Sequence, residues 1–138
     1  MRKILIVDDQ PCVQQLLTAE LTLEGYYVAS SGDAGSARRR LSSLRPDVVI
    51  LDLHLGGPDG FDFFEDIKRK YPDLPVIILT AYDSYRDDPR LSQADGYVVK
   101  SMALDELKGK IADVLSRKPA PEALGVKTQS SLFREAYG

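Results

Sequence analysis

The sequence predicts an α/β domain in which helices cover both faces of a parallel sheet. Five short runs rich in β-branched residues alternate along the chain with stretches whose apolar residues recur at helical spacing. The first run, at residues 4–7, is apolar at every position, which is typical of a strand buried on both faces. Because the runs and the helical stretches alternate at short spacing, we expect crossover helices and parallel strands.

The expected strands are short and spread evenly along the chain. They lie at residues 3–7, 26–30, 47–51, 75–79 and 96–99. Four of the helical stretches carry apolar stripes that predict the buried side of each helix. These stripes are Val13, Leu17 and Leu21, with Leu16 on the same side; Ala34, Ala37, Leu41 and Leu44; Phe61, Phe64 and Ile67; and Leu104, Leu107, Ile111 and Leu115.

Polar residues and prolines indicate where these helices begin and end. Asp33 precedes the second stripe and Ser101 precedes the last, so both are expected N-caps. Pro72 and Pro75 should stop the third helix, because proline cannot continue one.

The segment 84–93 should supply the fourth of five helices, but its sequence is poorly suited to one. Pro89 lies in its middle, and only Tyr85 and Leu91 in it are apolar. We therefore expect a short, distorted or partly unwound segment. Beyond about residue 117 the periodicity is lost, which predicts a folded domain over 1–117 and a tail or linker over 118–138.

The composition limits the classes of function. The chain has 138 residues, long enough for one core, and a net charge of −3 from 18 basic and 21 acidic residues. That balance argues against a domain that binds nucleic acid directly. No apolar run approaches the length of a membrane span, and the N-terminus does not resemble a signal peptide. A single cysteine, Cys12, is compatible with the reducing cytoplasm, where we expect this protein to lie.

Polar side chains follow or end four of the five expected strands. Asp8 and Asp9 follow the first strand and Asp52 the third, while Thr80 and Lys100 stand at the ends of the fourth and fifth. In a parallel sheet with crossover helices, these carboxyl ends share one edge. Carboxylates there suit Mg²⁺, which binds through few protein oxygens and favours phosphate partners.

Each of these residues also has a purely structural explanation. Acids after strands are common helix N-caps, and Asp9 could cap the helix that begins near Pro11. A lone lysine such as Lys100 is usually solvated, and a lone threonine such as Thr80 is usually a turn residue. Their joint occurrence at one sheet edge favours a site.

The chain resembles the receiver domains of two-component response regulators, over residues 2 to about 117. The resemblance rests on four stretches that occur in order at the spacing of the family. They are "LIVDDQ", "DVVILDLHLGGPDG", "VIILTAY" and "ADGYVVKS". It implies a flavodoxin-like (βα)5 doubly wound parallel sheet with the strand order 2-1-3-4-5.

The resemblance also implies roles for individual residues. Asp52 would accept a phosphoryl group from a histidine kinase or a histidine phosphotransfer protein. Mg²⁺ would be bound by Asp9 and Asp52 directly, by Asp8 through water and by the backbone carbonyl of His54. Lys100 and Thr80 would contact phosphoryl oxygens, and a movement of Thr80 would let Tyr97 turn inward. No conventional enzyme activity is implied, only self-catalysed phosphotransfer and slow autodephosphorylation.

For the chain as a whole, the resemblance implies a signalling switch. Its state would be passed to a downstream protein or to a C-terminal output domain, through the face formed by the segment 84–93 and the strand 96–99. A phosphorylation-dependent dimer is compatible with this.

Several positions depart from the family pattern. Ser101 stands where a proline usually forms a cis bond, so the Lys100–Ser101 bond is predicted to be either trans, or cis and strained. Gly56 replaces another frequent proline, and the stretch from Thr80 to Lys100 is about two residues short. His54 and Tyr82 are bulky and are expected to shield an acyl phosphate from water.

Two other classes of function therefore remain open. A phosphate-independent interaction module would explain the departures but not the intact acids. A small Mg²⁺-dependent phosphohydrolase would usually have a second acid two residues after the nucleophile, where this chain has His54.

Overall fold

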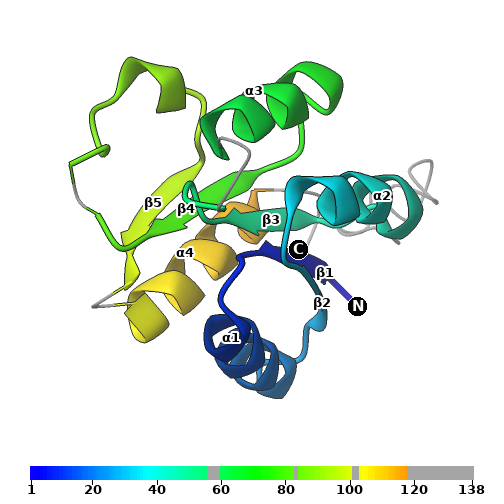
Figure 1. Cartoon of the computed structure of the whole chain (residues 1–138). Coiled ribbons are helices and arrows are strands. Elements are labelled where there is room, and N and C mark those ends of the chain that lie inside the picture. Colours follow the sequence, from blue (N-terminus) through cyan, green and yellow to red (C-terminus); the bar gives the residue numbers. More distant parts are fainter. Residues whose placement is uncertain (56–59, 83, 101–102, 118–138) are drawn as a thin grey trace, which may run out of the picture.

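The fold is a parallel five-stranded sheet with helices on both faces (Figure 1). The computed structural model describes residues 1–55, 60–82, 84–100 and 103–117. The strands are β1 (Lys3–Val7), β2 (Tyr27–Ser31), β3 (Val48–Leu51), β4 (Val76–Thr80) and β5 (Gly96–Val99). They lie in the order β2-β1-β3-β4-β5, and every neighbouring pair is parallel. The predicted fold class and strand order are confirmed.

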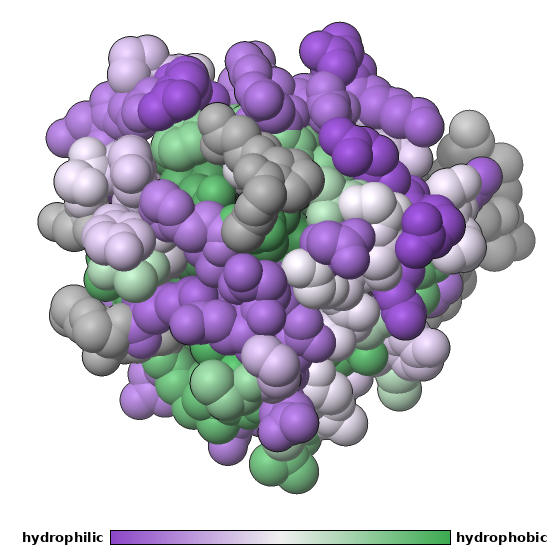
Figure 2. Space-filling model, in the orientation of Figure 1, coloured by the Kyte–Doolittle hydropathy of each residue, from purple (hydrophilic) through white to green (hydrophobic). Residues whose placement is uncertain are grey.

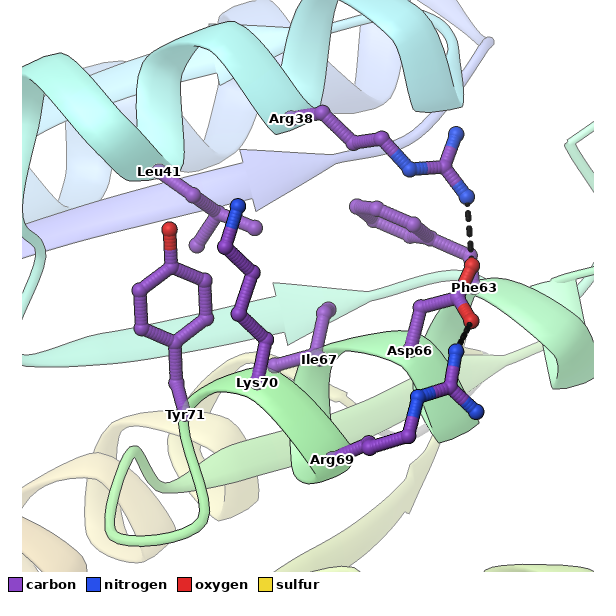
Figure 3. A pocket seen from close by; sticks show the side chains of 8 residues that line it. All are labelled: Arg38, Leu41, Phe63, Asp66, Ile67, Arg69, Lys70 and Tyr71. Atoms are coloured by element: carbon purple, nitrogen blue, oxygen red, sulfur yellow. Dashed lines mark hydrogen bonds and ion pairs between the residues drawn. The ribbon is translucent and has the colours of Figure 1, made fainter.

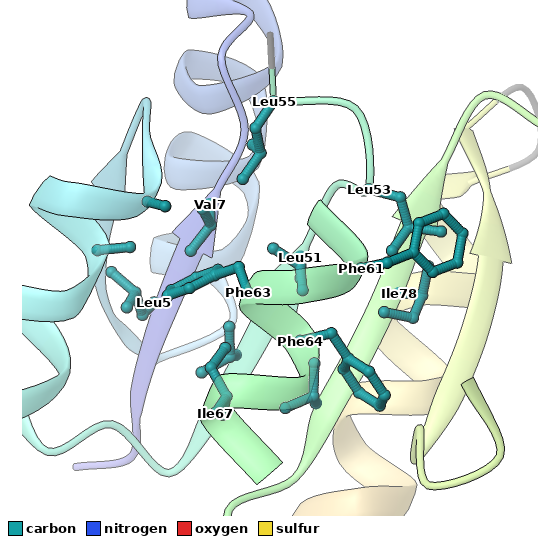
Figure 4. Packing of buried hydrophobic residues seen from close by; sticks show 14 of the residues in the cluster. Leu5, Val7, Leu51, Leu53, Leu55, Phe61, Phe63, Phe64, Ile67 and Ile78 are labelled. Atoms are coloured by element: carbon teal, nitrogen blue, oxygen red, sulfur yellow. The ribbon is translucent and has the colours of Figure 1, made fainter. Parts of the chain in front are cut away.

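Helices pack on the two faces of this sheet in pairs. The helices are α1 (Pro11–Leu23), α2 (Ala34–Leu44), α3 (Gly60–Lys70) and α4 (Ala103–Ser116). One apolar cluster joins α1 and α4 to one face of the sheet, and a second joins α2 and α3 to the other. Strand β1 contributes alternate residues to each, with Ile4 and Ile6 in the first and Leu5 and Val7 in the second. Figure 4 shows the second cluster, in which α3 inserts Phe63 and Phe64 over the sheet.

Helix α1 differs from its prediction in two respects. Leu17 and Leu21 are buried as expected, but Leu16 is 53% exposed. Adjacent helical residues point about 100° apart, so Leu16 falls outside the stripe centred on Leu17. The N-cap is Gln10, whose side chain makes no capping hydrogen bond, with Pro11 at the first helical position. Asp9 is therefore not the cap.

Helix α2 begins as its sequence predicts. The side chain of Asp33 accepts a hydrogen bond from the Ser36 N–H at 2.7 Å, which satisfies one of the unpaired donors of the first turn. The helix ends at Leu44, and Arg45 follows in the left-handed conformation with φ 52°. This turn directs the chain toward β3.

Between β4 and β5, where the sequence predicted a distorted helix over 84–93, the structure has a short 3-10 turn, η1 (Pro89–Leu91). The irregularity at Pro89 is as predicted. Asp88 caps the turn by accepting from the Arg90 N–H at 2.9 Å, and Leu91 is buried against α3. The Arg90 guanidinium lies 3.7 Å from the centre of the Phe61 ring. Side-chain contacts with α3 therefore hold this segment together with the short-range backbone hydrogen bonds of the turn.

Some predictions fall on residues outside the described part of the chain. They are the Ser101 cap, the isomer of the Lys100–Ser101 bond, the loop in which Gly56 replaces a proline, and the tail at 118–138. Within the described residues, no helix is both long and apolar enough to cross a membrane.

Candidate functional site

The predicted site residues meet at the edge of the sheet where the strands end. Asp8 and Asp52 each lie one residue beyond their strand, where backbone bonds still hold them in line with the sheet. The Asp8 N–H donates to the Ser31 carbonyl at 3.0 Å, and the Asp52 N–H donates to the Val7 carbonyl at 2.9 Å. The acids are therefore positioned by the sheet.

Three carboxylates form a compact group at this edge. One oxygen each from Asp8, Asp9 and Asp52 lie within 4.8 Å of one another. Asp8 and Asp52 are 1% and 4% exposed, whereas Asp9 is exposed. The buried Oδ2 of Asp8 accepts no hydrogen bond of good geometry, although the Lys100 ammonium lies 2.8 Å away. Clustered hard oxygens, one of them incompletely satisfied, fit a divalent cation such as Mg²⁺.

Lys100 is the cation that faces these acids in the structure. Its ammonium lies 2.8 Å from Asp8 Oδ2 and 3.1 Å from Asp52 Oδ2, and it donates to Gln10 Oε1 at 2.9 Å. Burial favours the neutral amine, but the close contact with Asp8 and the charge of Asp52 outweigh it and raise the pKa of Lys100. The ammonium form is thus stabilised at the site.

For Asp52, burial is the effect that decides the direction of the pKa shift. Burial raises the pKa of its carboxyl group above the usual value, and the charge of Asp8 adds to this rise. The His54 N–H, which donates to Asp52 Oδ1 at 3.1 Å, and the nearby Lys100 oppose the rise only in part. Two buried acids beside one ammonium therefore leave an excess of negative charge that a further cation would neutralise.

Two glutamines from the start of α1 belong to the site although the sequence analysis did not identify them. The Gln10 N–H donates to Asp8 Oδ1 at 2.9 Å, while its side chain accepts from Lys100. The Gln14 amide donates to the Asp8 carbonyl and accepts from the Ser30 hydroxyl on β2. The sequence feature that could have indicated them is their spacing of four residues, which places two side chains on the same side of a helix.

Thr80 and Tyr97 are connected through one intervening residue, Tyr82. Thr80 is fully buried, and its Oγ1 lies 3.4 Å from the Tyr82 N–H that donates to it. Tyr97 is 8% exposed and donates its hydroxyl to the Tyr82 carbonyl. The Arg86 guanidinium lies 4.9 Å from the Tyr97 ring centre. The Tyr97 ring is therefore packed inward, and its hydroxyl bonds the segment that follows β4.

Aromatic rings form one wall beside Asp52. The exposed rings of His54 and Tyr82 meet edge to face with their centres 4.9 Å apart, and Tyr85 lies 5.6 Å from His54. The cavity between this wall and the acids has a volume of about 350 Å³. It is lined by Asp9, Gln10, Asp52, His54, Ala81, Tyr82 and Lys100.

Comparison with known proteins supports an assignment to a family. The family model described as response regulator receiver domain matches residues 4–112. The probable transcriptional regulatory protein TcrX of Mycobacterium tuberculosis is 33% identical over 116 residues, which are 83% of this chain and 50% of that protein. The probable transcriptional regulator ycf27 of Guillardia theta is 38% identical over 119 residues, or 83% and 46% of the two chains. The chain thus spans about half the length of the curated relatives it matches.

Solved structures share the fold. The response regulator TrrA of Thermotoga maritima in complex with Mg(2+)-BeF is 40% identical, with a TM-score of 0.78 over 83% of this chain and 99% of that one. A second structure, of the histidine kinase ThkA in complex with TrrA, gives 41% identity and a TM-score of 0.78 over the same shares.

Proposed function

We propose that this chain, which belongs to the family of response regulator receiver domains, takes a phosphoryl group from a phosphohistidine donor onto the carboxylate of Asp52. The main support is the arrangement of charges: a buried acceptor carboxylate faces the Lys100 ammonium at 3.1 Å, and two further acids lie within reach of one cation. Such a group favours phosphoryl transfer, which depends on placement and charge neutralisation more than on acid–base catalysis.

Asp8, Asp9, Asp52 and the backbone carbonyl of His54 would hold Mg²⁺, with Asp9 and Asp52 as direct ligands and Asp8 acting through water. The bound ion would neutralise charge on the phosphoryl oxygens during transfer. An oxygen of Asp52 forms the new bond to phosphorus while the phosphorus–nitrogen bond of the donor breaks, and the bonding electrons leave with the imidazole. Lys100 compensates the charge of the phosphoryl group, and Gln10 holds the ammonium in position.

The readout of this reaction would pass through Thr80, Tyr82 and Tyr97. A phosphoryl oxygen would attract the Thr80 hydroxyl and weaken its long contact with the Tyr82 N–H. Because the Tyr82 carbonyl accepts from Tyr97, a shift of Tyr82 would also move the Tyr97 ring. The face formed by η1 and β5 would then change for a partner.

The partners follow from the same proposal. A histidine kinase or a histidine phosphotransfer protein would supply the phosphoryl group, and the relative TrrA has been solved in complex with the histidine kinase ThkA. A downstream protein or a C-terminal output domain would receive the signal, since the matched relatives are about twice as long and are named transcriptional regulators. A phosphorylation-dependent dimer would fit this scheme, and the chain would act in the cytoplasm without itself binding nucleic acid.

Intact mass after incubation with phosphoramidate tests the proposal. We expect one phosphoryl adduct that requires Mg²⁺ and is absent from the Asp52→Asn variant. Addition of a chelator should prevent the adduct without unfolding the protein, which circular dichroism can verify. An adduct that persists in Asp52→Asn would assign the reaction to another residue.

The irregular segment around η1 supports one alternative, a phosphate-independent interaction module. A 3-10 turn stands where the family usually has a helix, so that face is altered. If neither phosphoramidate nor a panel of phosphorylated histidine kinases gives an adduct, this alternative replaces the proposal. The phosphohydrolase is disfavoured, because the position two residues after Asp52 is an exposed histidine.

A further inference from the structure

A long groove runs between α2 and α3, away from the acidic site. It consists of two adjoining hollows of about 440 and 540 Å³ that share Leu41 and Tyr71 in their walls. The first hollow lies between the two helices, and the second continues past their last residues to Pro72 and Leu74. We call this feature the α2–α3 groove.

The first hollow has an apolar floor and a cationic rim (Figure 3). Leu41, Phe63 and Ile67 form the floor and are nearly buried, so they shape the groove more than they expose apolar area. On the rim, the Arg38 guanidinium lies 5.1 Å from the Phe63 ring centre, and the Lys70 ammonium lies 5.7 Å from that of Tyr71. The cations therefore stand directly above apolar surface.

Two of the rim cations are occupied by an acid of the groove itself. Asp66 accepts from Arg38 at 2.7 Å and also pairs with Arg69. The hydrogen bond from Arg38 holds the pKa of this carboxyl group below its usual value, with a further contribution from Arg69. Asp66 is therefore ionised and already satisfied.

The other two cations have no such partner. Lys70 and Arg45 are exposed, and no carboxylate within the described ranges forms an ion pair with either. Asp73 is the only other acid that lines the two hollows. In a chain with a net charge of −3, this groove is thus a locally positive surface, and Figure 2 shows hydrophilic side chains over α2 and α3.

We propose that the α2–α3 groove binds a short, extended, acidic segment of a partner protein. The volume of each hollow lies in the range of ligand sites, but the two lie in a row and are open along their length, which suits an extended chain. Lys70 and Arg45 provide separate sites for acidic side chains, and Tyr71, Pro72 and Leu74 provide apolar contact between them. A nucleic acid would require a longer series of cations than Lys70 and Arg45 provide.

This surface should bind its partner whether or not Asp52 is phosphorylated. The acids lie where the strands end, whereas α2 and α3 lead into the starts of β3 and β4 at the opposite edge of the sheet. The groove therefore lies away from the acidic site, and the inference does not depend on the proposed phosphoryl transfer.

Fluorescence polarisation with a labelled decapeptide of alternating glutamate and leucine tests the inference on the full chain. We expect binding that weakens with salt, and little binding of the matching lysine–leucine decapeptide. The double variant Arg45→Glu/Lys70→Glu should weaken binding by about tenfold or more.

A matched control separates the groove from the net charge. Arg39 and Arg40 are exposed on α2, do not line the groove and have no described ion-pair partner, so Arg39→Glu/Arg40→Glu changes the charge equally. This control should change affinity less than twofold, and Mg²⁺ with beryllofluoride should leave affinity unchanged. Amide NMR spectra of each variant verify the fold, and peptide-induced shifts should include Leu41, Tyr71 and Leu74.

Several outcomes would overturn the inference. They are equal weakening by the control variant, amide shifts confined to other surfaces, absence of binding by the wild type, and tighter binding of a single-stranded oligonucleotide at the same amides. The last would reassign the groove to nucleic acid.

Discussion

Replacing Lys100 by methionine tests the electrostatic account of the acidic site. The substitution keeps the apolar stem of the side chain and removes the only ammonium that contacts Asp8 and Asp52 among the described residues. These acids have side chains that are 2% and 5% exposed, so they lose their counter-charge in a poorly solvated place. We therefore expect Lys100→Met to lower the free energy of unfolding when Mg²⁺ is absent.

The contact distances allow an order of magnitude for this loss. At an effective dielectric constant near 20, each ammonium–carboxylate contact is worth roughly 5 kcal/mol before solvation is counted. Removing one partner of a buried pair usually costs about 3–5 kcal/mol in total. The Lys100 side chain is 18% exposed, so water can reach the acids once the ammonium is removed. We expect a loss of about 2–3 kcal/mol, at or just below the lower limit of that range.

Urea denaturation at pH 7, in chelator and in Mg²⁺, measures the effect. In chelator the midpoint should fall by about 1–2 M urea. Saturating Mg²⁺ should recover most of the loss, and it should stabilise the variant more than the wild type, where Lys100 competes for the same oxygens.

Lys108→Met is the matched control for this measurement. Its ammonium pairs with Glu20 at 3.0 Å on the surface between α1 and α4, so its loss should cost less than about 1 kcal/mol and should not respond to Mg²⁺. A Lys100→Met variant as stable as the wild type in chelator, or one that Mg²⁺ does not restore, would refute the account of the site.

Three further predictions concern stability and phosphate lifetime. Because burial raises the pKa of Asp52, folding favours its protonated form, and stability is lost as pH rises from the ordinary carboxyl value of about 3.9 through the raised one. In chelator, the free energy of unfolding of Asp52→Asn minus that of the wild type should therefore grow as pH rises. A difference that shrinks with pH in urea melts would contradict this. Asp33→Ala should lower the free energy of unfolding by about 1 kcal/mol through the missing hydrogen bond to Ser36, as measured by the same melts. An unchanged free energy of unfolding would mean that this cap does not stabilise the fold. The wall of His54 and Tyr82 should give an acyl phosphate that lasts for minutes. Alanine at either position should shorten the lifetime of this phosphate, which intact mass spectrometry follows over time. A wild-type lifetime of seconds would exclude shielding.

The layout of the site could be predicted from the sequence because it depends on short-range patterns. Alternating strand and helix signals place strand ends at one edge, so the order of the elements alone assigns Asp8, Asp52, Thr80 and Lys100 to that edge. Pro89 likewise predicted the loss of a regular helix, since proline acts through its own backbone.

The remaining features depend on packing between distant segments. The Gln14 side chain reaches the Asp8 carbonyl only because of how α1 is rotated at the end of β1, which residue spacing alone does not specify. The same rotation exposes Leu16, although the sequence predicted it on the buried side of the helix with Leu17 and Leu21. The α2–α3 groove arises from the separation of two helices, and their apolar stripes describe only the sides that face the sheet.

The bridge at Tyr82 has a consequence for how such a protein can diverge. Its amide contacts Thr80 and its carbonyl contacts Tyr97, so both links use main-chain atoms that every residue except proline provides. The phenol ring, which faces solvent beside His54, takes no part in either link. Under the proposed readout, mutation at this codon would alter how quickly a signal decays while the transmission of that signal is inherited unchanged.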